Sequence, residues 1–309
     1  MRKNQTTNKQ NRFSNLQLLL LAAPGLILIA LFCYIPLGGL VVVFKDYNFM
    51  DGIWGSPWAG LKNFEFFFYN MDKAWRATRN TLFLNALCII TGTVGSIIIA
   101  LFFNEINRKY FKKITQSLTI FPYFLSWIIV GGILSTFIDY DKGAINQLIF
   151  AWTGNRIDFL NQDKYWPAII SICNIWKNAG YNSIIYTATI TGLDPGMYES
   201  AELDGATTFK KMWYITVPLL KPTVILLTLL SVGRIFYGDL TMMMGLTNLN
   251  PMLIGTTEII DTFVYRSMTK SGDFAMSSAV GLYQSIFGFV LVTVSNFAAG
   301  KFDKDYKIF

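Results

Sequence analysis

Two cations stand inside long apolar stretches of the sequence, and their placement suggests a chemical task. Lys177 lies within residues 167–190 and Arg234 within residues 223–240. A charge near the middle of a membrane span costs at least about 3 kcal/mol on insertion scales, so each cation should face a partner or a watered cavity. The chemistry predicted for them is binding. A structural role is the alternative, with Lys177 paired to a carboxylate of a partner subunit and Arg234 to Asp239 or a lipid headgroup.

Catalytic chemistry is poorly supported by the sequence. The chain contains no histidine, which is the commonest general base and metal ligand, so Ser-His and Cys-His mechanisms are excluded. The acidic residues are scattered among loops, and a Gly-x-x-x-x-Gly-Lys-Ser/Thr loop for ATP phosphates is missing. Cys33, Cys88 and Cys173 fall in apolar stretches and predict no disulfide framework. We therefore expect no enzymatic activity, metal or cofactor in this chain.

The elements that position these side chains are predicted to be membrane helices. Of 309 residues, 53% are hydrophobic and 15% charged. About 20 consecutive apolar residues cross the hydrocarbon layer as a helix, and the sequence offers six such stretches, residues 16–44, 80–103, 117–138, 167–190, 223–240 and 279–300. We predict an all-α integral membrane protein with six transmembrane helices. The first stretch is about twice as long as the apolar core of a cleavable signal peptide, so we interpret it as an uncleaved helix.

The distribution of charge predicts the orientation of these spans. With the N-terminus inside the cell, the cytoplasmic segments hold 14 of the 26 basic residues and 7 of the 19 acids, whereas the external loops hold 10 basic residues and 11 acids. Short cytoplasmic loops carry an excess of Lys and Arg. This predicts a cytoplasmic N-terminal segment over residues 1–15, a six-span domain over residues 16–300 and a cytoplasmic tail over residues 301–309.

A polar segment at residues 199–218 separates the fourth and fifth predicted spans. The sequence predicts a break at Asp194-Pro195, a short helix from Met197 to Ala206 and a sharp turn at Gly205. Thr207 or Thr208 can then cap a second short helix, which we expect Pro218 and Pro222 to interrupt. The second helix is rich in apolar and aromatic residues, which favours a binding surface. A loop lying on lipid headgroups is the alternative.

The spacing within this segment carries a family resemblance. Glu199, Ser200 and Ala201 are followed by three residues and Gly205, then by nine residues and Ile215, one further residue, an aliphatic residue and Pro218. This resembles the coupling loop of binding-protein-dependent ABC importer permeases, with Ser200 in place of Ala and Val217 in place of Leu. The resemblance implies a cytoplasmic loop at about residues 191–222 that sits in a groove of a separate ATPase.

The resemblance also implies roles for individual residues. Glu199 is expected to brace the loop and contact the ATPase, Gly205 to allow the turn, and Trp213 and Ile215 to provide buried contact area. The rest of the expected ATPase-coupling set comprises Ser200, Ala201, Asp204, Ala206 and Pro218.

The working importer implied by the resemblance has several partners. They are a second, different permease subunit, two ATPase subunits that bind ATP and Mg, an extracytoplasmic solute-binding protein and membrane lipid, with no nucleic acid. The chain would be a multi-pass protein of the bacterial cell membrane.

Two long external loops, residues 45–79 and 241–278, are candidates to contact the binding protein, and we favour the later one. The aromatic residues of the earlier loop are expected at the outer membrane surface, and Met242, Met243 and Met244 of the later loop are expected to form an adaptable surface.

Weaker matches point to the cargo. Residues 176–182, leading to residues 191–195, and the segment 258–266 resemble permeases that import oligosaccharides. Sugars offer hydroxyl groups to polar side chains and apolar ring faces to aromatic rings. The predicted substrate passage comprises Trp176, Lys177, Tyr181, Asn182, Arg234 and Tyr237. If both cations face the passage, the expected cargo is acidic, such as a uronate oligosaccharide. Trp166 and Tyr283 are interpreted as interfacial anchors.

Other classes of function remain open at this stage. A permease of the same superfamily could carry a solute that is not a sugar. An ATP-independent secondary carrier would normally show internal repeats, and we find no convincing repeat. A membrane-embedded glycosyltransferase or hydrolase would need an acid pair or a metal cluster near one membrane face. ATP-independent uptake by the purified chain would favour the carrier, and turnover of a lipid-linked sugar would favour the enzyme.

Overall fold

The computed structural model of the chain describes residues 4–65 and 71–302, which fall into two units. One unit is formed by residues 4–65 and 272–282, and the other by residues 71–271 and 283–302. Within these ranges every named element is helical, and one isolated bridge joins Lys45 to Trp58. The predicted all-helical class is confirmed for the described residues.

The first unit begins with one long helical run. It contains α1 (Asn4–Ile29), the π-helical turn η1 (Ala30–Tyr34), the 3₁₀ segment η2 (Ile35–Phe44), the short helices α2 (Gly52–Gly55) and η3 (Lys62–Phe64), and the start of α15 (Phe274–Phe302). After Phe44 the chain turns back, and the Asn63 amide donates to the carbonyls of Val43 and Lys45. Of the predicted surface aromatics in this loop, Trp54 and Trp58 are exposed, whereas Phe66, Phe67, Phe68 and Tyr69 lie outside the described residues.

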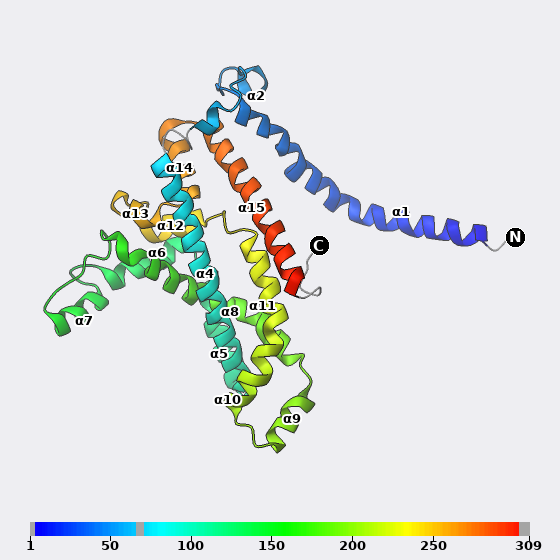
Figure 1. The fold of residues 1–309 in the computed structure, drawn as a ribbon, viewed down its shortest axis with the longest axis vertical. Helices are drawn as coiled ribbons and strands as arrows, with labels where there is room; N and C mark the ends of the chain where they lie inside the picture. Colours follow the sequence, from blue (N-terminus) through cyan, green and yellow to red (C-terminus); the bar gives the residue numbers. More distant parts are fainter. Residues whose placement is uncertain (1–3, 66–70, 303–309) are drawn as a thin grey trace. The chain divides into compact units, whose positions relative to one another are not determined.

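The second unit holds the remaining elements (Figure 1). In chain order they are α4 (Met71–Glu105), α5 (Lys109–Ile120), η4 (Phe121–Phe124), α6 (Trp127–Ile138), α7 (Ala144–Thr153), η5 (Asp163–Tyr165), α8 (Trp166–Thr191), α9 (Pro195–Leu203), α10 (Thr208–Lys211), η6 (Met212–Thr216), α11 (Val217–Val232), α12 (Leu240–Thr247), η7 (Pro251–Leu253), α13 (Ile254–Thr257), α14 (Ile260–Ser271) and most of α15.

The core of this unit lies where α4 and α8 run side by side and α6 packs on α12 (Figure 1). A cluster of buried side chains there is formed by Leu84, Trp127, Val130, Trp166, Ile170, Cys173, Met242, Met243, Leu246, Leu253 and Ile259. Two predictions were therefore wrong. Trp166 is 1% exposed and donates its indole N–H to the Phe159 carbonyl, so it is a core residue instead of an interfacial anchor. Met242 and Met243 fill the core and offer no adaptable surface.

Four helical stretches within the described residues are long and apolar enough to cross a membrane. They are Gln17–Phe44, Asp72–Glu105, Thr208–Val232 and Phe274–Phe297. A bent pair, Lys109–Phe124 with Trp127–Ile138, would make a fifth. The expected continuous helix over residues 117–138 was wrong, because the two members of this pair meet at 100°. Pro122 lies in the tight turn before the break, and the Ser126 hydroxyl caps the new helix by accepting from the Ile129 N–H.

The predicted fourth span corresponds to α8, a helix of 26 residues that is not among these apolar stretches. Its polar residues explain the difference, since Asn174, Lys177, Asn178 and Asn182 replace the aliphatic side chains that lipid would require. α8 packs against both α4 and α5. Ile172, Ile184 and Ile185 of the same helix are exposed, so α8 is buried on part of its surface only.

The fifth predicted span was misplaced at both ends. A continuous helical run leads from Thr208 into α11 and stops at Val232, eight residues before the predicted end. Pro218 and Pro222 do not interrupt it. The π-helical turn η6 precedes Pro218 and accommodates the ring, with the Val217 N–H reaching back to the Met212 carbonyl.

A buried carboxylate joins two distant parts of the second unit. Glu258 is 5% exposed and lies 2.8 Å from the Arg76 guanidinium of α4 and 3.3 Å from that of Arg266 on α14. Removing one member of a buried ionic cluster leaves the others without compensation. The segment 258–266 therefore contributes to holding α14 against α4.

Replacing Glu258 with Gln is expected to lower the free energy of unfolding by about 1–2 kcal/mol, a value reduced because both arginines are partly exposed. The matched control is Asp141→Asn, which breaks the solvent-exposed pair with Arg156. Thermal unfolding of the detergent-solubilised chain measures both. Equal stability of the two variants would contradict the proposed role of Glu258.

Candidate functional site

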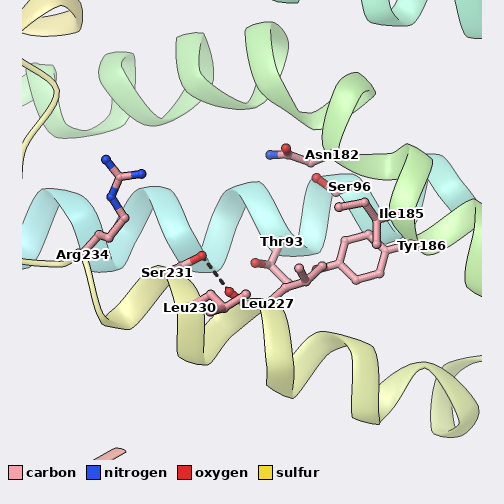
Figure 2. Close-up of a pocket in the computed structure, with 9 residues that line it drawn as sticks. All are labelled: Thr93, Ser96, Asn182, Ile185, Tyr186, Leu227, Leu230, Ser231 and Arg234. Atoms are coloured by element: carbon pink, nitrogen blue, oxygen red, sulfur yellow. Dashed lines mark hydrogen bonds between the residues drawn. The ribbon is translucent and has the colours of Figure 1, made fainter. Parts of the chain in front are cut away.

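A polar groove lies along α4, α8 and the end of α11. It consists of two adjoining hollows of about 310 and 330 Å³, which share Thr93, Asn182, Ser231 and Arg234. Figure 2 shows the first hollow, which is lined by side chains of α4, α8 and α11, with the Ser231 hydroxyl donating to the Leu227 carbonyl of its own helix. The other polar side chains in the lining are Asn85, Ser96, Asn174, Asn178, Tyr186 and Tyr237.

The α8 side of the groove is built from asparagines four residues apart. Asn174, Asn178 and Asn182 share one face because four residues turn an α-helix through about 400°. The Asn178 amide donates to Asn174 at 2.8 Å, and the Asn174 amide donates to the Cys88 carbonyl of α4 at 3.4 Å. Of these three, Asn182 alone belongs to the predicted substrate passage. The repeat of asparagine at this spacing in an apolar stretch was the signal that could have found the other two.

The opposite wall is an unwound segment that follows α11. Residues 233–239 leave the helix, and side-chain amides from two other helices donate hydrogen bonds to their backbone carbonyls. The Asn85 amide of α4 donates to the carbonyls of Ile235 at 2.7 Å and Tyr237 at 3.0 Å, and the Gln284 amide of α15 donates to Phe236 at 2.9 Å. Irregular backbone is tolerated at membrane depth when its polar groups are satisfied or line a cavity. Arg234 and Tyr237 are thus held on an anchored segment.

Arg234 presents an exposed guanidinium to the groove (Figure 2). Its side chain makes no ion pair or hydrogen bond with any residue in the described part of the chain. The predicted pairing with Asp239 was wrong, because the Asp239 carboxylate accepts from the Trp127 indole at 2.9 Å, the Thr241 hydroxyl at 2.6 Å and the Met242 N–H at 2.9 Å. Asp239 caps α12 and ties it to α6.

Lys177 is directed away from Arg234, toward the bend between η4 and α6. It is buried, and its ammonium donates to the carbonyls of Tyr123 at 2.6 Å and Leu125 at 2.7 Å. The ammonium also lies 5.4 Å from the ring centroids of Tyr123 and Trp127. At the break these two carbonyls have no helical N–H partner, and the Lys177 ammonium donates to them instead. Its partners are backbone carbonyls of this chain, and they account for its burial without a partner subunit.

The six predicted passage residues divide into separate groups. Asn182, Arg234 and Tyr237 line the polar groove. Lys177 lines another hollow of about 700 Å³ beside the bend, which shares Asn178 with the groove. Near this bend the Tyr181 ring stacks on Tyr123 with centroids 4.0 Å apart. Trp176 is 47% exposed and is not among the residues that line these hollows.

Replacing Lys177 with Met is expected to lower the free energy of unfolding by about 2–3 kcal/mol, because two buried carbonyls lose a charged donor. Lys177→Arg, which keeps the charge and its donors, should recover part of that loss. Thermal unfolding in detergent measures both. A Met variant of unchanged stability with altered uptake of acidic cargo would contradict this structural role and favour a place for Lys177 in the passage.

The predicted coupling segment folds as two short helices joined by a tight turn at one end of the second unit (Figure 1). The Asp194 carboxylate caps α9 by accepting from the Gly196 N–H at 2.9 Å, and the Thr207 hydroxyl caps α10 by accepting from the Lys210 N–H at 3.4 Å. Gly205 has φ +77°, a conformation that disfavours side chains. The break, the turn and the threonine cap predicted from sequence are confirmed.

Two side-chain contacts fix the second short helix against the first. The Tyr198 and Thr216 hydroxyls lie 2.9 Å apart, and the Lys211 ammonium lies 3.3 Å from the Glu202 carboxylate. Glu199, Ser200, Asp204, Gly205 and Trp213 are exposed, whereas Ala201, Ala206, Ile215 and Pro218 are half-buried. Tyr214, which belongs to the apolar and aromatic residues predicted for the second short helix, is exposed as well, and sequence reasoning missed the exposed side chains of Leu203 and Phe209. A surface of this kind is typical of a docking site.

Residues 92–307 match the family model described as binding-protein-dependent transport system inner membrane component. Two relatives come from Bacillus subtilis (strain 168). Protein LplB is 36% identical over 93% of this chain and 90% of its own length. The polygalacturonan/rhamnogalacturonan transport system permease protein YteP is 37% identical over 93% of this chain and 89% of its own length.

Solved structures show the same fold. One chain, from a bacterial ABC transporter involved in the import of the acidic polysaccharide alginate, matches with a TM-score of 0.82 and 30% identity, covering 95% of this chain and 98% of that chain. A second, from a bacterial alginate ABC transporter in complex with an alginate pentasaccharide-bound periplasmic protein, gives a TM-score of 0.84 and 29% identity over 96% and 98% of the two chains.

Proposed function

This chain belongs to the family of binding-protein-dependent transport system inner membrane components, and on that premise we propose that it is a permease subunit that forms the passage for an oligosaccharide in an ATP-driven importer. It is a helical membrane transport component. YteP, at 37% identity, is named for polygalacturonan/rhamnogalacturonan transport, and a solved neighbour at 30% identity is named for import of the polysaccharide alginate. Relatives at 23–24% identity are named for trehalose/maltose, lactose and sn-glycerol-3-phosphate. The more similar proteins therefore support a sugar as the cargo over a non-sugar solute.

The observation that carries this proposal is the direct connection between the exposed coupling segment and the polar groove. α10, η6 and α11 form one helical run from Thr208 to Val232, and the same run supplies Leu227, Leu230 and Ser231 to the groove. The backbone is continuous across the π-helical turn, where the Val217 N–H bonds to the Met212 carbonyl. Displacement of the coupling segment would therefore be transmitted along this run to the groove wall.

The energy for such a displacement would come from other chains. We propose two ATPase subunits, which bind ATP and Mg, and a second permease that completes the passage. An extracytoplasmic binding protein would deliver the sugar, and a solved structural neighbour in complex with a periplasmic protein supports this arrangement. Closure of the ATPases on ATP would move the coupling segment and open the passage outward, and hydrolysis would reset it.

The membrane arrangement that fits this role has six spans with both termini in the cytoplasm. The bent pair Lys109–Phe124 with Trp127–Ile138 would be the third span, and α8 would be the fourth. The asparagines of α8 line the groove, other residues of the helix pack on α4 and α5, and the exposed apolar side chains of Ile172, Ile184 and Ile185 would meet lipid or a partner subunit. Polar residues inside membrane proteins commonly line a substrate pathway.

Copurification followed by reconstitution tests the proposal. The affinity-tagged chain, isolated from its native membrane, is expected to bring with it an ATPase and a second multi-span protein. Proteoliposomes containing this complex and the binding protein are expected to take up labelled oligosaccharide when ATP is supplied on the ATPase side, and to stop when ATP is replaced by ADP. Uptake by the chain alone without nucleotide would overturn the proposal in favour of a secondary carrier.

A further inference from the structure

The polar groove contains one charge. Among the residues that line its two hollows, Arg234 is ionised at neutral pH and the others are neutral amides, hydroxyls, apolar side chains and a thiol. Hydroxyl groups of a sugar can be bound by amides and hydroxyls alone. A guanidinium is not needed for that task, and its desolvation in a membrane protein is costly.

No acid in the described part of the chain neutralises this guanidinium. The unwound segment carries one carboxylate, Asp239, and a second, Asp261 of α14, contacts the segment at Gly238. Asp239 is engaged by Trp127, Thr241 and Met242. Asp261 accepts from the Gly238 N–H at 2.7 Å and from the Gln284 amide at 3.3 Å. Neither forms an ion pair with Arg234.

The backbone that carries Arg234 is anchored on both sides. The side-chain amides of Asn85 and Gln284 donate hydrogen bonds to the backbone carbonyls of Ile235, Phe236 and Tyr237. The Tyr237 hydroxyl lies 2.7 Å from the Ser285 hydroxyl. Holding a binding group in place before the ligand arrives reduces the entropy cost of binding. The arrangement is that of a prepared anion-binding group in a neutral polar groove.

We propose that Arg234 is a specificity residue that binds the carboxylate of an acidic sugar unit as the oligosaccharide passes along the groove, and that Asn178 and Asn182 bind the hydroxyl groups of the same cargo. The inference rests on the proposed function. The planar guanidinium can offer two parallel N–H donors to a carboxylate. A cargo that supplies its own anion at this position would recover the interaction that the chain itself leaves open.

The test compares two cargoes that differ only in charge. The cargoes are a labelled oligouronide trimer and its carboxyl-reduced neutral analogue. Each is trapped with the binding protein inside vesicles that contain the reconstituted importer, and ATP is supplied on the ATPase side. Passage through the permease is then measured for both cargoes. Arg234→Gln removes the charge, Arg234→Lys keeps it without the two-donor geometry, and Lys142→Gln removes a cation from an exposed external loop.

The expected result is selective. Arg234→Gln should raise KM for the acidic trimer roughly tenfold to a hundredfold, because a charged hydrogen-bonded contact is lost, while its uptake of the neutral trimer stays at the wild-type rate. Arg234→Lys should give an intermediate KM, and Lys142→Gln should match the wild type. Neutral uptake by the Gln variant also shows that it is folded.

Three outcomes would overturn the inference. An equal loss of uptake for both cargoes in Arg234→Gln would indicate that Arg234 makes a structural contact, such as an ion pair with a carboxylate of the second permease. Unchanged acidic uptake in that variant would show that the cation does not meet the cargo. ATP-driven wild-type uptake of the neutral trimer alone would exclude an acidic substrate and leave the proposed function intact. ATP-independent uptake would instead contradict the proposed function.

Discussion

Replacing Gly205 with proline is expected to stop ATP-driven uptake while the chain still inserts into the membrane and the importer still hydrolyses ATP. Gly205 has φ +77°, and proline is confined to φ near −65°. The substitution also removes the N–H that donates to the Glu202 carbonyl at 3.0 Å. The turn between α9 and α10 would be rebuilt, and the exposed side chains on its two sides would lose their relative placement.

The size of this effect follows from the proposed docking surface. Burial of the exposed Trp213 against an ATPase would contribute roughly 1.5–3 kcal/mol before ordering costs, and the half-buried Ile215 would contribute less. Loss of one such contact corresponds to about a tenfold weaker docking equilibrium or more. Because the variant is confined to an exposed loop, the amount of protein in the membrane should stay unchanged.

Gly205→Asn is the matched control. Asparagine tolerates the left-handed conformation and keeps the backbone N–H, so it should retain most uptake. The measurements are uptake and ATP hydrolysis in the same proteoliposomes. Normal uptake by the proline variant would remove the assigned role of the loop, and equal loss in both variants would show that the side chain, and not the backbone turn, matters.

The local features of this loop could be predicted from sequence because the signals are themselves local. Proline after Asp194 ends a helix, glycine at 205 permits positive φ, and threonine at 207 caps the next helix, each acting on residues a few positions away. The continuous run through Pro218 and Pro222 could not be predicted this way. A π-helical turn before Pro218, in which the Val217 N–H bonds to the Met212 carbonyl, accommodates the proline ring within the helix.

The groove depended on contacts between residues far apart in the chain. α11 ends at Val232 because Asn85 and Gln284, which are 150 and 48 positions from the carbonyls they bind, stabilise the unwound segment. Likewise, the bend after Phe124 is stabilised by Lys177, more than 50 positions away. Apolar stretches alone predict helices, and they cannot show which distant amide or ammonium will replace a helical hydrogen bond.

The division of the predicted passage residues has the same origin. Lys177 and Arg234 look alike in sequence, each a cation in an apolar stretch. The structure separates them because Lys177 reaches two free carbonyls of a broken helix, whereas Arg234 sits on a segment whose carbonyls are already bound. One cation has a structural contact within the chain, and the other is available to a ligand.

Replacing Gly131 with leucine is expected to prevent the second unit from folding. α6 and α12 cross at a pair of glycines, and a Cβ atom on Gly131 would overlap the Gly245 carbonyl and lie 2.7 Å from its carbon atom. A Cβ on Gly245 would in turn lie 2.5 Å from the Trp127 backbone. These contacts are with backbone atoms, which cannot rotate away as a side chain can. Small residues at such crossings allow helices to approach closely in membrane proteins.

The graded variant Gly131→Ala should already lower the free energy of unfolding by about 3 kcal/mol, as overpacking of a buried contact does. The adjacent Gly132 is the matched control, since a Cβ there would meet no atom within 4 Å. Gly132→Ala removes the same helix-weakening glycine and should leave stability equal or up to about 1 kcal/mol higher. Thermal unfolding in detergent distinguishes the two positions. If both alanine variants unfolded at the same temperature, α6 and α12 would not approach each other at Gly131, and the Asp239 contact to Trp127 across this crossing would lose its support as well.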